Sequence, residues 1–336
     1  MPVGLFIAGA AVLGASGVGI GAKGGYDHHR AKLINNDSNS RLENAATRLE
    51  ELRKKCGNSI TGLGEEKLIV LSTSMTRFVN LFSQLKNVDF TTSVGLEELS
   101  RIMVGSKDFE EIQEYSKFST SLMEGAGAGA VGGAAAAFGA YSAVMTFASA
   151  STGTAISTLN GVAATNATWA RLGGGSLASG GMGMAGGMAV LGGLVAGPAL
   201  LVMGVIVGAK GGKSLEEAKA NAYKANEMCE QFENGALECI AIRRRSHMFY
   251  KILARLDALL MPLTYEMERI IEEEGTDYSK FSAESKKSIA AAASTAISVK
   301  SLLDTPILTE DGKLTDESEQ LAISLIDKIK EKEVAA

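Results

Sequence analysis

The chain has 336 residues, of which 46% are hydrophobic and only 6% aromatic, and it contains 39 glycines but four prolines. Strand-forming patterns are nearly absent, so the composition predicts an all-α protein whose long helices pack through small residues. The net charge of -5 excludes a general nucleic-acid binder, and we expect no duplex nucleic acid as a partner.

Residues 1–25 are predicted to form an N-terminal apolar segment, because residues 2–22 carry no charge. Basic residues follow this segment instead of preceding it, so a secretory signal is not expected. If the segment spans a membrane, the positive-inside tendency places the chain from Lys23 onward in the cytoplasm. Its glycine content equally allows a helix that packs on protein and inserts only on activation.

Residues 26–124 are predicted to form a helical domain. A narrow seam with 3-4 spacing suits one partner helix, and it consists of Leu42, Ala45, Leu49, Leu52 and Cys56. Glycines at 57, 62 and 64 predict a break before a second helix, whose buried face would be Leu68, Leu71, Met75, Phe78, Leu81, Phe82 and Leu85. Shorter helices are expected near residues 96–103 and 109–123.

Residues 125–209 form an apolar run with one charged side chain, Arg171, and one proline, Pro198. A bilayer is crossed by roughly 20 apolar residues, so the run is long enough to insert more than once. Residues 187–209 are the best spanning candidate and residues 125–150 a weaker one. Residues 151–168 carry several threonines and asparagines, which predicts a polar-faced helix or re-entrant turn between them.

Glycines of the apolar segments recur four residues apart, so they form smooth stripes along which helix backbones can approach closely. Each costs a helix in water roughly 1 kcal/mol relative to alanine, whereas a bilayer offers backbone groups no partner but each other. The predicted helix-packing glycines are Gly17, Gly21, Gly125, Gly129, Gly133, Gly183, Gly187, Gly193, Gly197, Gly204 and Gly208.

The middle of the chain resembles a recurrent bacterial family of glycine-zipper membrane proteins, largely without assigned activity. The resemblance rests on residues 139–141 (GAY), 153–155 (GTA), 163–168 (AATNAT), 173–176 (GGGS) and 184–187 (MAGG), and it extends to Arg243, Arg244 and Arg245. The architecture is also similar to helical membrane effectors, such as pore-forming toxins and the membrane arms of anti-phage systems like Hailong. The resemblance implies a membrane protein and carries over no catalytic residue.

Residues 210–263 are predicted to form long helices, and their start echoes the N-terminus. Residues 204–212 (GVIVGAKGG) match residues 17–25 (GVGIGAKGG) at an offset of 187, and the helix after them matches the earlier one at an offset of 171. This indicates an internal pseudo-repeat, although a bias toward small residues explains the match equally well. The second seam is Leu215, Ala218, Ala222, Ala225, Cys229, Phe232, Ala236 and Cys239.

Between Glu238 and Asp257 the chain contains no acidic residue, and a basic face is expected there. This candidate anion site, for a lipid head group, a nucleotide or an oligonucleotide, consists of Arg243, Arg244, Arg245, His247, Lys251 and Arg255. Helical spacing places four of these on one face, opposite an apolar face that begins at Ile242. The alternative is a solvated face paired with glutamates of a neighbouring helix, such as residues 272–274.

Pro262 is predicted to end the basic helix, and residues 264–336 form an acidic helical tail that could cover it as a lid. This tail contains 16 acidic and 9 basic residues. Helices are expected near residues 264–274, 283–303 and 316–333, the last with a capping box of Asp316 and Glu319. Residues 306–314 predict a turn, or a minimal hairpin, around Gly312.

No enzyme active site, cofactor or metal site is expected. Residues 208–214 (GAKGGKS) have one residue too few for a P-loop and follow no strand. The adjacent His28 and His29 would point about 100° apart on a helix, which is unsuitable for shared metal ligation. The odd number of cysteines makes a disulfide framework unexpected and favours a reducing compartment.

The function predicted from these features is that of a membrane-inserting, oligomeric effector that permeabilises a bilayer by forming a pore or channel. Bacterial defence is its candidate role, and an anionic ligand or surface would regulate it. Its partners would be membrane lipids and copies of itself, at the bacterial inner membrane with the polar helices on the cytoplasmic side, or in the cytoplasm before insertion. The alternatives are a non-enzymatic membrane scaffold that recruits a partner and a soluble helical oligomer that buries its glycine-rich helices.

Overall fold

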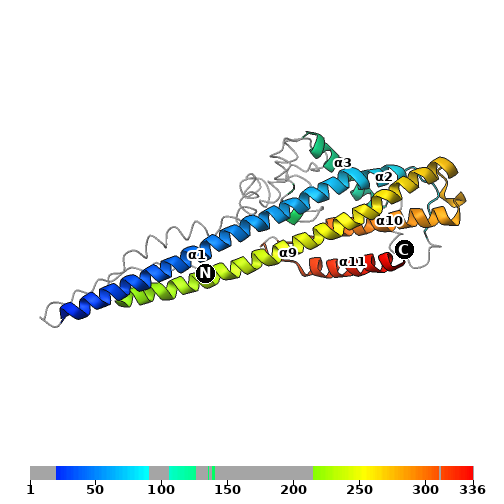
Figure 1. Cartoon of the computed structure of the whole chain (residues 1–336). Coiled ribbons are helices and arrows are strands. Elements are labelled where there is room, and N and C mark those ends of the chain that lie inside the picture. Colours follow the sequence, from blue (N-terminus) through cyan, green and yellow to red (C-terminus); the bar gives the residue numbers. More distant parts are fainter. Residues whose placement is uncertain are drawn as a thin grey trace. The chain divides into compact units, whose positions relative to one another are not determined.

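The computed structural model of the protein describes residues 20–90, 106–125, 135, 138–140, 215–309 and 312–335. These residues are almost all helical and include no strand, which confirms the all-α prediction (Figure 1). A π-helical turn, η1 (Leu71–Met75), joins α1 to α2, and a 3-10 turn, η6 (Tyr278–Lys280), follows α9. The α-helices are α1 (Ile20–Val70), α2 (Thr76–Phe82), α3 (Lys107–Gly125), α9 (Leu215–Glu274), α10 (Ala283–Asp304) and α11 (Asp316–Ala335).

The chain divides into two compact units, one of Met1–Thr47 with Leu201–Phe232 and one of Arg48–Leu200 with Glu233–Ala336. In the first unit, the beginnings of α1 and α9 lie side by side and run in the same direction (Figure 1). Its buried positions recur at spacings of three, four and seven residues, the pattern of paired helices. They are Ala31, Asn35, Ser38 and Leu42 on α1, and Ala218, Ala225 and Phe232 on α9.

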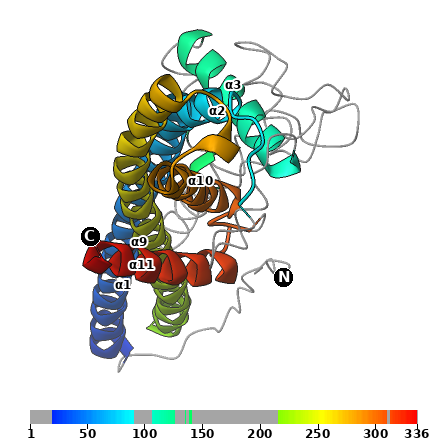
Figure 2. The same ribbon diagram turned by 90° about the vertical axis from the view of Figure 1, so that its right-hand side faces the viewer.

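In the second unit, α10 lies among the other helices. Figure 2 shows it nearly end-on, between α9, α2 and α11. The face predicted from sequence is buried as expected, with Ile289, Ala292, Ala293, Ala296, Val299 and Leu303 all inaccessible to solvent. An aromatic cluster centred on Phe82 joins α2 to α3, with ring centroids 5.2 Å from Phe78 and 5.5 Å from Phe109. The predicted buried face from Leu68 to Leu85 is confirmed.

Within this unit α1 and α9 run parallel in a fixed register. Arg48 forms an ion pair with Glu233 at 2.9 Å, and the hydroxyl of Ser74 donates a hydrogen bond to Asp257. These partners are 185 and 183 residues apart in the chain. The packing register therefore lies near the sequence echo at an offset of 187 and does not match the echo at 171.

The predicted break at glycines 57, 62 and 64 is wrong, because α1 continues through all three. Each glycine costs a helix about 1 kcal/mol, and burying one large aliphatic side chain contributes roughly 1.5–3 kcal/mol. Ile60, Leu63 and Leu68 are all buried on this stretch of α1. Tertiary packing thus outweighs the local preference against a helix.

Pro262 does not end the basic helix either, since α9 continues for twelve residues beyond it. An internal proline costs about 3 kcal/mol and leaves the carbonyl four residues earlier without its donor. That carbonyl belongs to Ala258, an exposed residue that water can reach. The buried side chains of Leu260, Met267 and Ile270 hold the helix on both sides of the proline.

The C-terminal helices begin and end close to the predicted positions, but the cap of α11 differs. Thr315, not Asp316, precedes the helix, and its hydroxyl accepts a hydrogen bond from the Ser318 amide at 3.4 Å. The turn before it is the predicted minimal hairpin, with an antiparallel bridge between Leu308 and Leu314. Gly312 has φ 78°, a left-handed conformation that glycine adopts without strain.

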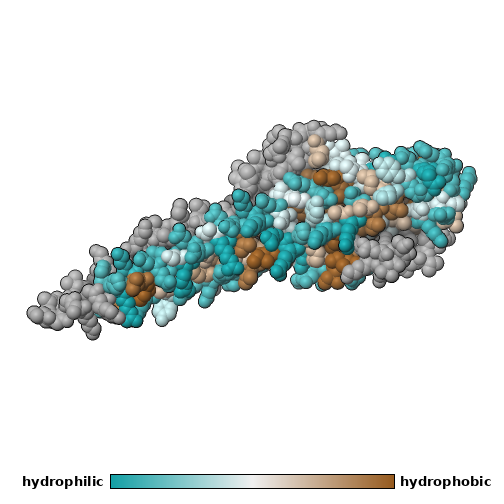
Figure 3. Space-filling view, in the orientation of Figure 1, coloured by the Kyte–Doolittle hydropathy of each residue, from teal (hydrophilic) through white to brown (hydrophobic). Residues whose placement is uncertain are grey.

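On the face shown in Figure 3, most of the described surface is hydrophilic, with hydrophobic residues in separate patches. None of the described helices is both long and apolar enough to cross a membrane. The predicted spanning segment at residues 187–209, and the helix expected near residues 96–103, lie outside the described residues. So do all the predicted helix-packing glycines except Gly21 in α1 and Gly125 at the end of α3. Of the weaker candidate at residues 125–150, the structure describes only residues 125, 135 and 138–140.

Candidate functional site

The predicted basic face lies on α9, where the structure separates its six residues into three groups. Arg244, His247, Lys251 and Arg255 are exposed, as predicted from their spacing, and the apolar positions opposite them are buried. Arg243 is half-buried, and Arg245 is buried.

Arg245 connects α9 to the start of α11. Its guanidinium donates to the Ser318 hydroxyl at 2.6 Å and forms an ion pair with Glu319 at 2.9 Å. It also lies 3.4 Å from the carbonyl oxygen of Thr315. The acidic tail thus contacts the basic stretch at Arg245, which is engaged in a structural contact.

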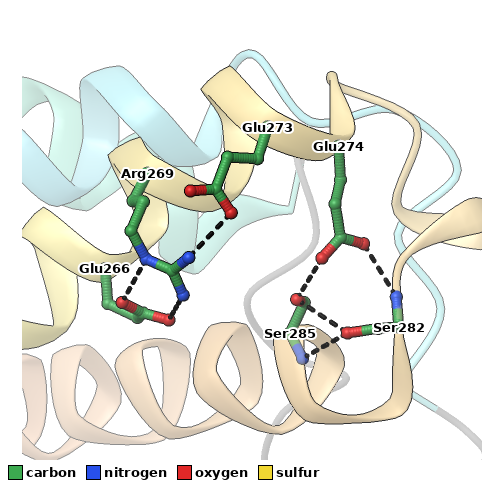
Figure 4. A network of polar contacts seen from close by, with 6 residues as sticks. All are labelled: Glu266, Arg269, Glu273, Glu274, Ser282 and Ser285. Atoms are coloured by element: carbon green, nitrogen blue, oxygen red, sulfur yellow. Dashed lines mark hydrogen bonds and ion pairs between the residues drawn. The ribbon is translucent and has the colours of Figure 1, made fainter.

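The four exposed basic residues have no ion-pair partner among the described carboxylates. Two of the three glutamates predicted to neutralise them, Glu273 and Glu274, interact elsewhere (Figure 4). Glu273 forms an ion pair with Arg269 at 2.7 Å, and Glu274 accepts a hydrogen bond from the Ser282 amide at 2.8 Å. Arg244, His247, Lys251 and Arg255 therefore form a positively charged surface on the described part of α9, which we call the basic face.

A second candidate site lies where the apolar run meets α1. The described residues of the run beyond α3 are Ala135, Phe138, Gly139 and Ala140, and we call them the docked segment. All four are buried in the second unit. The carbonyl oxygen of Ala140 accepts hydrogen bonds from the amides of Ile307 and Leu308 at 3.0 and 3.1 Å. This part of the run is therefore packed within protein.

Two glycines allow the docked segment to touch the backbone of α1. A Cβ on Gly64 would lie 1.7 Å from the carbonyl oxygen of Ala135, and a Cβ on Gly139 would lie 1.9 Å from that of Ile60. Only glycine fits at such contacts. Gly64 and Gly139 thus allow a close backbone contact, and neither belongs to the predicted set of helix-packing glycines.

Lys67 is fully buried beside this glycine contact, with 0% of its surface exposed. Its Nζ donates to the carbonyl oxygen of Phe138 at 2.9 Å and lies 4.9 Å from the centre of the Phe138 ring. Burial lowers the pKa of Lys67 to about 7, against an opposing effect of the Asp304 carboxylate. The docked segment is thus held in part by an ammonium group that is costly to keep charged.

Lys300, on α10 of the same unit, is a buried lysine with carboxylate partners. Its Nζ lies 2.9 Å from Glu111 and 3.4 Å from Asp108, both on α3, and also pairs with Asp304. Burial alone would lower the pKa of Lys300, but its hydrogen bonds to Asp304 and Glu111 outweigh this effect and raise the pKa. This cluster fixes α3 to α10.

A cavity of about 360 Å³ lies between α2 and α3. It is lined by Thr76, Val79, Asn80, Gln113, Ser116, Lys117 and Thr120. The buried Ser116 hydroxyl has no hydrogen-bond partner among the described groups. In the described ranges, no three His, Cys, Asp or Glu side chains are grouped to hold a metal ion.

No known protein family, curated protein or solved structure matches this chain. The resemblance to glycine-zipper membrane proteins therefore stays a prediction. The sequence analysis missed Lys67 and Gly64 as site residues, although a signal for Lys67 existed. The 3-4 spacing of Cys56, Ile60 and Leu63 continues to position 67 and predicts that it is buried.

Proposed function

We propose that this protein is a membrane-inserting effector that permeabilises a bilayer as an oligomer, and that the docked segment marks its form before insertion. The observation that carries the proposal is the contact between the docked segment and Lys67. The apolar run of residues 125–209 has a single charged side chain. Its described part is packed against Lys67, a fully buried lysine whose pKa is lowered by burial to about 7, so its release is favoured by re-hydration of the ammonium.

The direction of the two long helices supports this proposal. Apolar sequences precede both α1 and α9, and the first residues of these helices, Ile20 and Leu215, belong to the same unit. Because α1 and α9 run parallel there (Figure 1), both apolar sequences join the helices from one end. In our proposal they enter one bilayer together, with the helices on the cytoplasmic side of a bacterial inner membrane.

The basic face supplies a surface for an anionic membrane. Arg244, Lys251 and Arg255 are exposed, and each Lys or Arg near an anionic surface contributes about 1 kcal/mol of attraction at moderate salt. Lipid phosphate is the partner that we favour, because it is available at the membrane where the apolar run would insert. A nucleotide or an oligonucleotide would engage the same phosphate chemistry.

Dye release from vesicles of phosphatidylglycerol and phosphatidylethanolamine tests the proposal. Wild type should release the dye, Gly64→Ala should release it faster because it disrupts the docked segment, and Lys67→Met should release it more slowly because docking is strengthened. Gly62→Ala is the matched control, since a Cβ there meets nothing within 4 Å. Intact vesicles with all four proteins at high protein-to-lipid ratio would refute the permeabilising function.

The second candidate is a soluble helical oligomer that buries its glycine-rich helices in protein. It is favoured by the packing of Ala135 and Ala140 inside the second unit, where no part of either residue is exposed. Carbonate extraction of expressing cells separates the two candidates. An inserted effector stays with the membrane pellet, whereas a protein that buries its apolar run in itself is extracted.

A further inference from the structure

Two of the three cysteines meet between α1 and α9. Cys56 and Cys239 are free thiols with 5% and 8% of their surfaces exposed, and their side chains are hydrogen-bonded to each other. Cys229 belongs to the other unit. The sequence analysis did not expect a disulfide framework, and the structure adds that two thiols 183 residues apart in the chain lie in contact.

Arg53 lies one helical turn before Cys56 and completes the pair. It is buried, and its guanidinium hydrogen-bonds to the sulfur of Cys239. The hydrogen bond from Cys56 and the charge of Arg53 lower the pKa of Cys239 to about 7, although burial opposes them. The pKa of Cys56, the donor in this pair, is raised by the same hydrogen bond and by burial. Cys239 is therefore the thiolate of the pair.

Contacts on both sides hold the two thiols in register. Toward the start of the unit, Arg48 pairs with Glu233, and a Cβ on Gly235 would lie 3.3 Å from the Leu49 side chain. On the C-terminal side of both cysteines, the Ser74 hydroxyl donates a hydrogen bond to Asp257. Two further charges act on the pair, Arg243 on Cys56 and Glu238 on Cys239.

We propose that Cys56 and Cys239 form a redox modification site that a peroxide converts to a disulfide between α1 and α9. The Cys239 thiolate attacks a peroxide oxygen, the O–O bond breaks, and hydroxide leaves a sulfenic acid on Cys239. Cys56 gives its proton to that hydroxide, forming water, and its sulfur attacks the Cys239 sulfur. The S–O bond breaks and the departing oxygen leaves as hydroxide, which takes up the proton released when the thiolate formed. The two thiols thus supply the two electrons that reduce one peroxide to two waters.

The disulfide would close a loop that contains the whole apolar run. A bond across such a long loop restricts the unfolded chain strongly. We expect the melting temperature of the full-length chain to rise by about 5–10 °C on oxidation and to return on reduction. This proposal does not depend on the proposed membrane activity, because the disulfide and the melting temperature are measured on the protein alone.

The test is a titration of the reduced full-length chain with hydrogen peroxide, followed by intact mass and peptide mapping. Wild type should lose about 2 Da, and a Cys56–Cys239 peptide should appear that dithiothreitol removes. Cys229→Ser is the matched control and should behave like wild type, whereas Cys56→Ser and Cys239→Ser should form no such bond. Retention of all three thiols at excess peroxide, a bond through Cys229, or over-oxidation of Cys239 in the wild type would each overturn the proposal.

The role of Arg53 is tested by the rate of oxidation. Arg53→Met should slow disulfide formation about tenfold at pH 6.5, because less Cys239 is then thiolate, and the end product should be unchanged. In wild type the rate should rise as pH increases through about 7. An unchanged rate and pH profile in Arg53→Met, with the fold intact by circular dichroism, would exclude a role for the guanidinium in activating Cys239.

Discussion

Two buried lysines of the same unit are held in opposite ways. Lys300 has three carboxylates around its ammonium group, and its pKa is raised. Lys67 has a backbone carbonyl and an aromatic ring, and its pKa is lowered to about 7. Lys67 is completely buried and Lys300 keeps 8% of its surface exposed, so burial and partners together set the two pKa values apart. The Lys300 cluster is a permanent connection between helices. The Lys67 contact, which holds the apolar run, depends instead on the charge state of the lysine.

The largest expected effect on stability comes from replacing Lys300, the lysine whose charge is paired with carboxylates. Lys300→Met leaves Asp108, Glu111 and Asp304 facing one another, and we expect a loss of about 3–5 kcal/mol in the free energy of unfolding at pH 7. The loss should shrink at pH 4 to 5, where carboxylates take up protons. Urea unfolding at both pH values measures it, with the exposed Lys287→Met as control. A loss below 1 kcal/mol would mean that the cluster stabilises nothing.

Replacement of Lys67 should change the free energy of unfolding in the opposite direction. Lys67→Met removes a fully buried charge whose pKa is lowered by burial, and we expect a gain of about 1–4 kcal/mol in the free energy of unfolding at pH 7. Urea unfolding of Lys67→Met and of the exposed Lys54→Met, each compared with wild type, measures this gain. A destabilised Lys67→Met would show that the ammonium is needed to hold Phe138.

The gain should depend on pH in a defined direction. The folded pKa of Lys67, about 7, lies below its ordinary value of 10.5, so between these values the unfolded chain holds the extra proton. The cost of Lys67 therefore grows as pH falls from 10.5 to 7 and is constant below 7. The advantage of Lys67→Met should be largest at or below pH 7 and decline toward pH 10. An advantage that increased with pH would contradict the lowered pKa.

The smallest expected effects on stability come from two glycine substitutions in α1, which change packing without changing charge. Gly64→Ala places a methyl group against the Ala135 carbonyl, and overpacking of this kind costs about 1–3 kcal/mol. Gly62→Ala, two residues away in open space, should stabilise the helix by about 0.5–1 kcal/mol. Thermal unfolding of both variants measures the difference. Equal effects would show that the docked segment does not pack on Gly64 in solution.

The sequence predicted what depends on periodicity. The buried face of α10, the apolar face of α9 from Ile242 to Leu260 and the exposure of Arg244 follow from residue spacing, and the structure confirms them. Predictions from single residues were wrong, because Pro262 and the glycines of α1 lie within helices whose packing outweighs their local cost. The partners of Arg245 and Lys67 are contacts between distant segments, which no local pattern encodes.

The parallel register of α1 and α9 has a consequence for the order in which the protein folds. The residues that pair across these helices are about 185 positions apart in the chain. A ribosome adds roughly 5–20 residues per second, so α1 waits on the order of 10–40 s after its own synthesis before its partner exists. During that time its seam, with Leu42, Leu49 and Cys56, has no native helix to cover it.

Contacts between residues so far apart also make folding slow, because the chain loses the entropy of loop closure before the packing contacts stabilise it. When several ribosomes translate one message, the uncovered α1 of one copy lies near the newly completed α9 of another. Pairing between copies reproduces the same seam, which is the exchange of identical elements that produces domain-swapped dimers. The register that stabilises one chain thereby also provides a route by which two chains assemble while they are being made.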